Sequence, residues 1–542
     1  MQYRKIVEVI MYQDRKIWIG TSGEEKVYIY PKMANRHGMI AGATGTGKTI
    51  TLKVMAESFS SCGVPVFLAD VKGDLAGMSN IGTMNENVQK RVDAMGLAEA
   101  GYKFDSYPTT YWDIYGEKGL PLRTTISEMG PLLLSRIMDL NDTQSDILTI
   151  LFKIADDEQL LLIDTKDLKS MLQYVAEHSK EYSLEYGNIS KQSIAAIIRA
   201  VVALESEGAE FFFGEPALNI ADWFCRDCDG KGTIQVLDCQ KLINNPTMYA
   251  TFMLWMMSEL FETLPESGDK DKPKMVFFFD EAHLLFKGAP KALLQKIEQV
   301  VKLIRSKGVG IYFITQNPKD IPDDVLAQLG NKVQHALRAY TPTEQKAAKA
   351  AAQSFRVNPE FDTYETLISL GTGEALISVL DEDGIPTVVK KCDILPPQSQ
   401  MGAIDDGERA SKIKDDMLYM KYNQEMDRDS AYEFLQRKNL SDAEAEAKAA
   451  EEQAAAKAAE KAAAEKAKLE AKAAQEKEKE AAAKKKQVGK AVKSVASSAA
   501  GTIGRQLGNE IGESIGGSFG KKLGGNVGAS LGRGILSTLF KL

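Results

Sequence analysis

The sequence predicts an α/β fold in which helices cover a parallel β-sheet, followed by a helical stalk. Apolar, strand-like runs alternate with helical spacing near the start, at 38–42 and 65–70, and such runs return at 275–280 and 310–315. Alternation of strands and helices is typical of a parallel sheet with helices on its faces. The stalk is predicted because residues 441–487 are almost entirely Ala, Glu, Lys and Gln, which are strong helix formers.

Length and composition are those of a soluble protein with several domains. The 542 residues exceed one ordinary core, and 67 Lys and Arg against 75 Asp and Glu give a net charge of −8. This balance excludes a uniformly basic nucleic-acid coat but allows a local basic channel. The five cysteines do not suggest a disulfide framework and fit a reducing cytoplasm. We expect no signal peptide and no transmembrane segment, because no apolar run of about 18 residues occurs.

The predicted core is interrupted by a helical segment. Residues 80–265 carry mostly helical apolar spacing with few strong strands, which indicates an inserted or extended helical subdomain. Residues 332–340 form a late core strand, and Asp383-Gly384 is the predicted turn of a terminal hairpin. In order, the predicted parts are strands with a glycine loop (1–79), the helical subdomain (80–265), the rest of the core (266–400), a linker helix region (401–440), the stalk (441–487) and a glycine-repeat tail (488–542).

The stalk lacks the apolar seam of a strong coiled coil. Ser441 and Glu444 are the predicted capping box at its start, and Glu444 with Lys448 is a stabilising i,i+4 pair. Leu469 is nearly its only large apolar residue. The composition favours a solvated, isolated helix, and a weak alanine-rich coiled coil is the alternative.

The tail has a glycine at every fourth position from 504 to 532, each after an apolar residue. A period of four exceeds the helical 3.6, so the stripe drifts by about 40° per repeat around a straight helix. Small residues four apart allow close helix contact. Self-association is the leading interpretation, with peripheral membrane contact and flexible disorder as alternatives. Charges such as Arg505 and Glu510 argue against a membrane span.

The strongest motif is a glycine-rich loop between an apolar strand and a helix. It matches G-x-x-x-x-G-K-[ST], the phosphate-binding loop of P-loop NTPases. Glycines let backbone N–H groups point at phosphate oxygens, and the helix N-terminus attracts the anion. Lys48 is expected to reach the β- and γ-phosphates of ATP, and the Thr49 hydroxyl to ligate Mg²⁺. The loop consists of Gly42, Ala43, Thr44, Gly45, Thr46, Gly47, Lys48 and Thr49.

Two acidic residues follow the apolar run 275–279 and form the predicted Walker B motif. Asp280 would position Mg²⁺ through water, and Glu281 is the predicted catalytic residue that polarises the attacking water. A glutamate next to the aspartate favours hydrolysis of ATP over nucleotide binding alone.

Several other polar positions have a functional and an ordinary interpretation. Gln316 would sense the γ-phosphate, or it belongs to a simple strand-end turn. Arg305 could stabilise the γ-phosphate of a neighbouring subunit, or it is a surface arginine; Arg338 is a weaker candidate for that role. The segment 70–74 would support the metal shell or contact a substrate, and a plain turn is equally compatible.

Cysteine and histidine positions give no clear metal motif. Cys225 and Cys228 form a C-x-x-C pair without a second pair at suitable spacing, so we interpret them as ordinary free thiols. His283, after the acidic pair, is a predicted positioning residue. The remaining histidines form no visible cluster.

Together these motifs resemble the bacterial HerA-like ATPases of the YjgR type, in the HerA/FtsK branch of P-loop motors. The resemblance covers roughly residues 5–400. It implies a RecA-like core with an additional strand, and a hexameric ring with ATP sites between subunits. It also implies that Arg305 is a trans-acting arginine finger and that Gln316 is the polar sensor. The segments that carry it are GMIAGATGTGKT, FLADVKGDLAG, FFFDEAHLLF, IRSKGVGIYFITQNPKDIP and LGNKVQHALRAYTP.

The leading hypothesis is a cytoplasmic, Mg²⁺-dependent ATPase that forms a ring and acts as a DNA translocase or helicase-like motor. The alternative is an ATP-driven assembly or signalling module, which the tail recruits to a protein partner or a membrane surface. A nucleotide-gated scaffold with negligible turnover is a third option, against which the position of Glu281 argues. Stimulation of ATP hydrolysis by DNA would separate the first two hypotheses.

Overall fold

The computed structural model describes residues 11–488, except residue 269 and residues 288–290. The chain forms two compact units, Met1–Leu435 and Gln436–Leu542, and each is described by itself. The expectations for the first ten residues and for the glycine-repeat tail concern segments outside the described residues.

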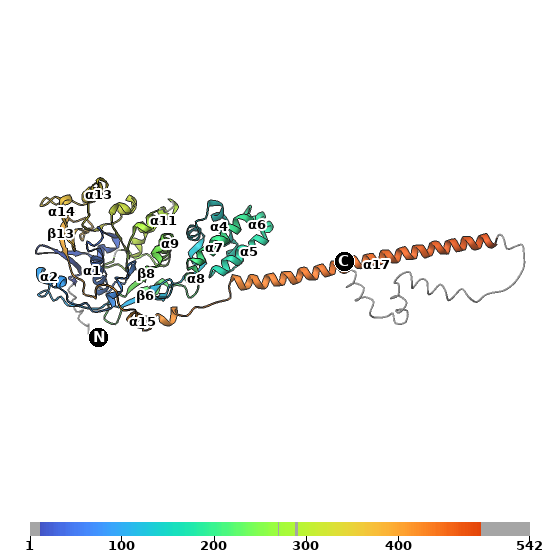
Figure 1. Ribbon diagram of the computed structural model, residues 1–542, viewed down its shortest axis with the longest axis horizontal. Helices are drawn as coiled ribbons and strands as arrows, with labels where there is room; N and C mark the ends of the chain where they lie inside the picture. Colours follow the sequence, from blue (N-terminus) through green and yellow to red (C-terminus); the bar gives the residue numbers. More distant parts are fainter. Residues whose placement is uncertain (1–10, 269, 288–290, 489–542) are drawn as a thin grey trace. The chain divides into compact units, whose positions relative to one another are not determined.

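A mixed sheet of 13 strands dominates the described part of the first unit (Figure 1). Its parallel strands are β4 (Gly38–Ala41), β5 (Val66–Asp70), β6 (Thr109–Asp113), β7 (Leu120–Pro121), β8 (Ile234–Asp238), β9 (Met275–Phe279), β10 (Val309–Thr315) and β11 (Asn331–His335). Their order is β11-β4-β10-β9-β5-β8-β6-β7. Thr315 pairs with Ala41 and Phe313 with Phe279, so β10 lies between β4 and β9. This is the additional-strand arrangement that the family resemblance implies.

Antiparallel strands extend one side of the sheet. They are β1 (Tyr12–Gln13), β2 (Lys16–Ser22), β3 (Glu25–Ile29), β12 (Glu374–Ser378) and β13 (Lys390–Ile394). Strand β12 pairs with β11 and β13, and β13 pairs with β2. Gly384, with φ +79°, lies at the predicted turn between β12 and β13, and its N–H donates to the Asp381 carbonyl. The N-terminal strands therefore join the sheet through the C-terminal hairpin.

Alternate residues of the central strands serve two hydrophobic cores, because side chains along a strand point to opposite faces. Phe277 and Phe279 belong to one core, and Val276 and Phe278 to the other. The Val276 core also contains residues of α1 (Lys48–Ser61) and α2 (Glu86–Ala94). The Phe277 core contains residues of α9 (Pro246–Thr263) and α11 (Lys291–Ile304). The sheet is thus covered on both faces.

Nearly all residues of helix α1 are buried, including several polar ones. The segment after β13 covers its outer face. There the Lys53 ammonium donates to the Gln400 carbonyl at 2.6 Å, and the Glu57 carboxylate accepts from the Ser399 N–H at 3.1 Å. Polar side chains of α1 such as Lys53 and Glu57 are thus paired although they are buried.

Residues 80–265, expected to be mostly helical, also contribute β6, β7 and β8 to the sheet. Polar residues such as Thr109, Gln235 and Asp238 weaken the apolar pattern of these short strands. Between β7 and β8 the chain is helical, and Figure 1 shows α4 to α7 grouped together. These helices are α3 (Ile126–Ile137), α4 (Asp142–Asp157), α5 (Thr165–Glu177), α6 (Ser179–Tyr186), α7 (Lys191–Ser206) and α8 (Ala209–Phe212).

The remaining short helices of the first unit follow β9. They are α10 (His283–Phe286), α12 (Asp323–Leu326), α13 (Pro342–Gln353), α14 (Thr363–Ser369), α15 (Asp406–Lys414) and α16 (Tyr419–Tyr422). Of these, α10 matters most for the site, because it begins directly after the predicted acidic pair.

Helix α17 (Ala431–Val488) starts earlier than the sequence predicts. Ser441 lies inside it, so the predicted capping box is wrong. The N–H and hydroxyl of Ser430 instead bond to the Glu433 carboxylate at 3.0 and 2.8 Å. Leu435 is buried in the core of the first unit. Tertiary packing near the start of the helix therefore decides where it begins, and the helix propensities of the local residues do not show this packing.

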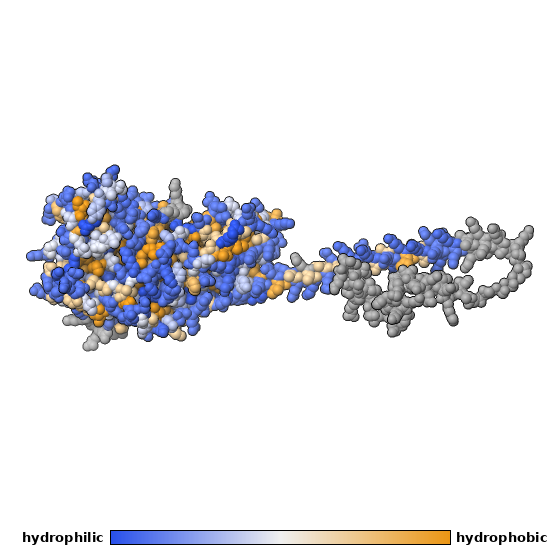
Figure 2. Space-filling view, viewed as in Figure 1, coloured by the Kyte–Doolittle hydropathy of each residue, from blue (hydrophilic) through white to orange (hydrophobic). Residues whose placement is uncertain are grey.

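Beyond Leu435, the described side chains of α17 are almost all exposed. On the face shown in Figure 2, hydrophilic residues are interspersed with more hydrophobic ones along this helix. Across residues 11–488, leaving aside 269 and 288–290, no helix has the length and hydropathy needed to span a bilayer.

Candidate nucleotide site

The glycine loop occupies the turn between β4 and α1, at the carboxyl edge of the parallel sheet. Gly45 and Gly47 have φ of +76° and +115°, a region that favours glycine. Gly42, with φ +152°, passes so close to His335 that an added Cβ would lie 2.5 Å from the histidine Cβ. The motif glycines are therefore required by backbone geometry and by close approach.

Backbone hydrogen bonds fasten this loop to neighbouring strands. Gly42 N–H donates to the Thr315 carbonyl at 3.2 Å, and Ala43 N–H donates to the Ala336 carbonyl at 2.8 Å. The Thr46 carbonyl accepts from Gly373 N–H at 2.9 Å. The loop is thus tied to the ends of β10 and β11 and to the residue before β12.

His335 is a buried support of the loop that sequence reasoning missed. Its Nδ1 lies 2.8 Å from the Glu374 carbonyl, and its Nε2 lies 2.8 Å from the Thr51 hydroxyl in α1. Because a carbonyl only accepts, Nδ1 carries the proton and Nε2 accepts from Thr51. Burial lowers the pKa of His335 to about 4, so the ring is neutral near pH 7. Only its position at the end of β11, opposite the glycine loop, could have indicated this role.

Lys48 lies over the loop that precedes it. Its ammonium donates to the carbonyls of Gly42 at 2.7 Å and Ala43 at 3.1 Å. Burial, followed by the nearby Lys72, lowers the pKa of Lys48. The ammonium borders a cavity of about 260 Å³, whose lining includes Gly45, Gly47, Thr49, Lys72 and Asp280.

Asp280 and Glu281 follow β9 at the same edge of the sheet. Desolvation, and then the neighbouring Glu281, raise the pKa of Asp280 to about 6. Glu281 has φ +48°, an uncommon conformation for a residue with a side chain. The Tyr249 hydroxyl donates to the Asp280 carbonyl at 2.8 Å, and the Ala282 N–H donates to the Ile314 carbonyl. Flanking contacts thus hold the acidic pair in this strained turn.

The two oxygens of the Glu281 carboxylate face different groups. Oε1 lies 3.6 Å from the Lys72 ammonium, which borders the phosphate-loop cavity. Oε2 accepts from the Gln316 amide at 3.3 Å and lies 3.3 Å from His283 Nδ1. The fold therefore brings the predicted residues Glu281, Gln316 and His283 together, and adds Lys72.

The residues around the loop fit a Mg²⁺ ion. The Thr49 hydroxyl and Asp280 carboxylate both line the cavity, and hard oxygen ligands suit this ion. The raised pKa of Asp280 indicates a carboxylate that a nearby cation would stabilise.

Within segment 70–74, Asp70 and Lys72 have different roles. The Asp70 carboxylate closes the turn, accepting from Gly73 N–H at 2.7 Å and Leu75 N–H at 3.1 Å. Desolvation raises the pKa of Asp70 to about 7. Asp70 is a turn residue, whereas Lys72 reaches the site.

The structure does not bring Arg305 to this cavity. Arg305 precedes β10, whereas Gln316 follows it, so the strand separates them by roughly 20 Å. Arg338 is exposed, and its guanidinium donates to the Ile368 carbonyl at 3.4 Å. Neither arginine belongs to the phosphate pocket of its own chain.

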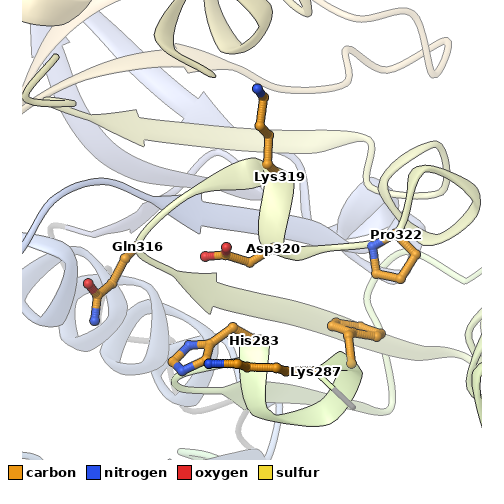
Figure 3. Close-up of a pocket in the computed structure, with 7 residues that line it drawn as sticks. His283, Lys287, Gln316, Lys319, Asp320 and Pro322 are labelled. Atoms are coloured by element: carbon orange, nitrogen blue, oxygen red, sulfur yellow. The ribbon is translucent and has the colours of Figure 1, made fainter. Parts of the chain in front are cut away.

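A second cavity, shown in Figure 3, has a volume of about 520 Å³. His283 and Gln316 line it and also contact Glu281. In Figure 3, Lys287 extends toward His283, and Lys319 points away from the other labelled side chains. The remaining lining residues are Phe286, Asp320 and Pro322.

Cys225 and Cys228 are free thiols, half-buried and exposed respectively. In the described ranges there is no group of three or more His, Cys, Asp or Glu side chains arranged to hold a metal ion.

Comparison with known proteins connects the chain to one family. The family described as "Helicase HerA-like C-terminal" matches residues 16–523. A probable helicase of Methanocaldococcus jannaschii, MJECL08, is 30% identical over 167 residues, which are 29% of this chain and 30% of that protein. The chain thus spans less than a third of that relative.

Two further similarities cover more of the chain. The DNA double-strand break repair helicase HerA of Sulfolobus acidocaldarius is 21% identical over 384 residues, covering 69% of this chain and 67% of that protein. A solved structure of the plasmid coupling protein TrwB in complex with ADP and Mg²⁺ has a TM-score of 0.45 and 14% identity. It covers 72% of this chain and 90% of its own.

Proposed function

We propose that this chain, which belongs to the HerA-like helicase C-terminal family, is a Mg²⁺-dependent ATPase that forms a ring and moves DNA. The observation that carries the proposal is the position of Glu281. Its carboxylate follows Asp280 directly, and one of its oxygens lies 3.6 Å from Lys72, a residue of the phosphate-loop cavity. A carboxylate at the edge of a phosphate site suits activation of water for attack on a phosphoryl group.

Each residue around the loop has a proposed role. Lys48 and the loop N–H groups neutralise phosphate charge, and Thr49 and Asp280 hold Mg²⁺, which would neutralise charge on the β- and γ-phosphates. Glu281 accepts the proton of the attacking water. Gln316, hydrogen-bonded to Glu281, reports the state of the γ-phosphate.

We place the ATP sites between subunits of a hexamer because of where Arg305 lies. It is at the opposite end of β10 from its own phosphate loop, so it would serve the site of a neighbouring subunit. Mixing Arg305→Ala chains with Lys48→Ala chains tests this. Each variant alone should be inactive, and a mixture should regain part of the ATPase activity. A mixture as inactive as its components would contradict a shared site.

DNA is the proposed substrate because the curated relatives are named as helicases. The main experiment measures ATP hydrolysis by the full chain with and without single-stranded and duplex DNA, at several salt concentrations. We expect DNA to stimulate turnover, and the stimulation to weaken steeply with salt. Turnover that no form of DNA alters would contradict the DNA motor but leave the ATPase proposal intact.

The alternative function is an ATP-driven assembly or signalling module in the cytoplasm. The long exposed helix α17 favours it, since such a helix can carry the glycine-repeat tail to a protein partner or a membrane surface. Removal of residues 488–542 and measurement of mass in solution, with and without ATP, would test the tail's part in self-association.

A further inference from the structure

The Glu281 carboxylate contacts lining residues of two cavities. Oε1 faces Lys72, which lines the phosphate-loop cavity, and Oε2 faces Gln316 and His283, which line the second cavity. Any group that competes for these two donors acts directly on Oε2. The second cavity therefore has a physical route to the proposed catalytic residue.

The contacts on Oε2 restrain Glu281. A general base needs an oxygen lone pair directed at the attacking water, whereas Oε2 accepts from the Gln316 amide at 3.3 Å and lies 3.3 Å from His283 Nδ1. Both contacts are longer than typical charge-assisted hydrogen bonds, which span about 2.7–2.9 Å. They orient the carboxylate toward the second cavity but are weak enough for a ligand to exchange.

The lining of the second cavity suits an anion with several acceptor oxygens. His283 and Gln316 can donate, and the exposed Lys287 extends toward His283 (Figure 3). Asp320 is the acidic residue of the lining, and its Oδ2 already accepts from the Thr315 hydroxyl at 2.9 Å and from the Asn317 N–H at 3.2 Å. Its charge is therefore partly offset.

The size and walls of the cavity narrow the class of ligand. About 520 Å³ is roughly twice the phosphate-loop cavity and is in the range of small-ligand sites. Phe286 and Pro322 add apolar surface beside the donors, which suits a sugar or base next to a phosphate. A strand of nucleic acid offers this combination of phosphodiester and apolar surface.

We infer that the second cavity binds a phosphodiester group of a nucleic-acid strand, and that occupancy draws His283 and Gln316 off Glu281. The carboxylate is then free to turn to the water at the γ-phosphate. This inference rests on the proposed ATPase function and adds the means by which DNA would control it. His283 is a positioning residue in this scheme.

The first test is His283→Ala in the full chain. Loss of one restraint should raise kcat without DNA on the order of threefold to tenfold, with KM for ATP within about twofold, and should reduce the stimulation by DNA. His283→Asn, which keeps an N–H donor near the Nδ1 position, should restore low DNA-free turnover. A merely structural role would instead lower kcat in both variants. DNA-free kcat that stays equal or falls in His283→Ala, with unchanged stimulation, would overturn the restraint.

The second test addresses the ligand. Lys287→Ala should raise the DNA concentration for half-maximal stimulation about threefold to tenfold and make the salt dependence shallower by about one counterion. Lys302→Ala removes an exposed lysine of α11 outside the lining and is the matched control. Equal effects of the two variants would overturn the assignment of the cavity.

Inorganic phosphate separates the two sources of the anion. If millimolar phosphate without DNA activates turnover as oligodeoxythymidine does, the ligand is a free anion and the strand assignment is wrong. The outcomes also separate this inference from the ATPase proposal. If the wild-type chain hydrolyses no ATP under any condition, the ATPase proposal is wrong. If all cavity variants show normal DNA-stimulated turnover, only the inference that the second cavity controls Glu281 is wrong.

Discussion

The phosphate loop and the Glu281 carboxylate lie at the same edge of the sheet but are held differently. Three backbone hydrogen bonds, of 2.8 to 3.2 Å, join the loop to neighbouring segments of the sheet. The buried His335 packs against the loop and bonds to Thr51 and to the Glu374 carbonyl. Glu281 is held through its side chain by three contacts of 3.3 to 3.6 Å. Two of its partners, Lys72 and Gln316, are exposed.

On the proposed function, this difference separates nucleotide binding from hydrolysis. Backbone hydrogen bonds to the sheet fix the conformation of the loop, so the loop can move only if the sheet moves with it. The geometry proposed to bind phosphate is therefore a fixed property of the fold. Long side-chain contacts to a carboxylate exchange at low cost, so the orientation of Glu281 can respond to ligands. The predictions below test each half of this comparison, starting with the largest expected effect.

Lys48→Ala should weaken binding of the nucleotide phosphates. We expect ATP turnover to fall by about three orders of magnitude, because the ammonium that meets the β- and γ-phosphates is lost. Steady-state ATPase assays and binding of a fluorescent ATP analogue measure this. Lys302→Ala, an exposed lysine outside the site, is the control and should keep both properties. Normal analogue binding and turnover in Lys48→Ala would place the nucleotide elsewhere.

Glu281→Gln should abolish most ATP hydrolysis while preserving ATP binding. The amide keeps the size of the side chain but cannot accept the proton of water, so turnover should fall by about two to three orders of magnitude. Affinity for ATP should stay within about threefold, and bound ATP should persist in a filter-binding assay. Hydrolysis at the wild-type rate would show that another group is the base.

Gly42→Ala should damage the loop without touching the acidic pair. An added Cβ would lie 2.5 Å from the His335 Cβ and would be strained at φ +152°. We expect a loss of about 2–4 kcal/mol in stability or a matching loss of nucleotide affinity. Gly101→Ala is the control, since its φ is +86° but nothing lies within 4 Å. Equal costs in the two variants would mean that close approach to His335 is unimportant.

His335→Asn should change the pH dependence of stability. The pKa of His335 is about 4 in the folded chain, below the unfolded value of roughly 6.5. Between these values the unfolded chain binds the proton and the folded chain does not, so stability falls as pH falls from 6.5 toward 4. Denaturant unfolding measures the free energy of unfolding at pH 7 and at pH 5. Its decrease between the two pH values should be about 2 kcal/mol smaller in the variant than in wild type. Other shifted groups, such as Asp70, are present in both chains and cancel. If the free energy of unfolding decreases equally in both chains between pH 7 and pH 5, burial of His335 does not lower its pKa.

Much of the site was predictable because its signals are local. The loop glycines, Lys48 and the acidic pair are read from short motifs, and the parallel sheet puts the carboxyl ends of β4, β9 and β10 at one edge. Gln316 could be placed for the same reason. His335 could not, since it acts through partners far away in sequence and belongs to no motif with a fixed spacing. Lys72 lies in the predicted segment 70–74, but its contact with Glu281 joins residues far apart in the sequence.

The boundaries of elements were less predictable than the motifs. Strand β8 was missed because Gln235 and Asp238 interrupt its apolar pattern, although the whole strand is buried. The start of α17 was misplaced because a capping box at Ser441 matches the motif, while burial of Leu435 decides the actual start. In both cases packing overrides a weak local signal.

The sequence by itself determined the phosphate loop and the acidic pair, because backbone geometry and strand periodicity are encoded within a few adjacent residues. The additional-strand sheet was implied by the resemblance that these motifs carry. Only the tertiary structure decided what surrounds the Glu281 carboxylate. Its three partners come from the ends of β5 and β10 and from α10, and no local pattern records which oxygen each one faces. The order of the chain already puts Arg305 before β10 and Gln316 after it, and the assembled sheet adds that the phosphate loop lies at the Gln316 end.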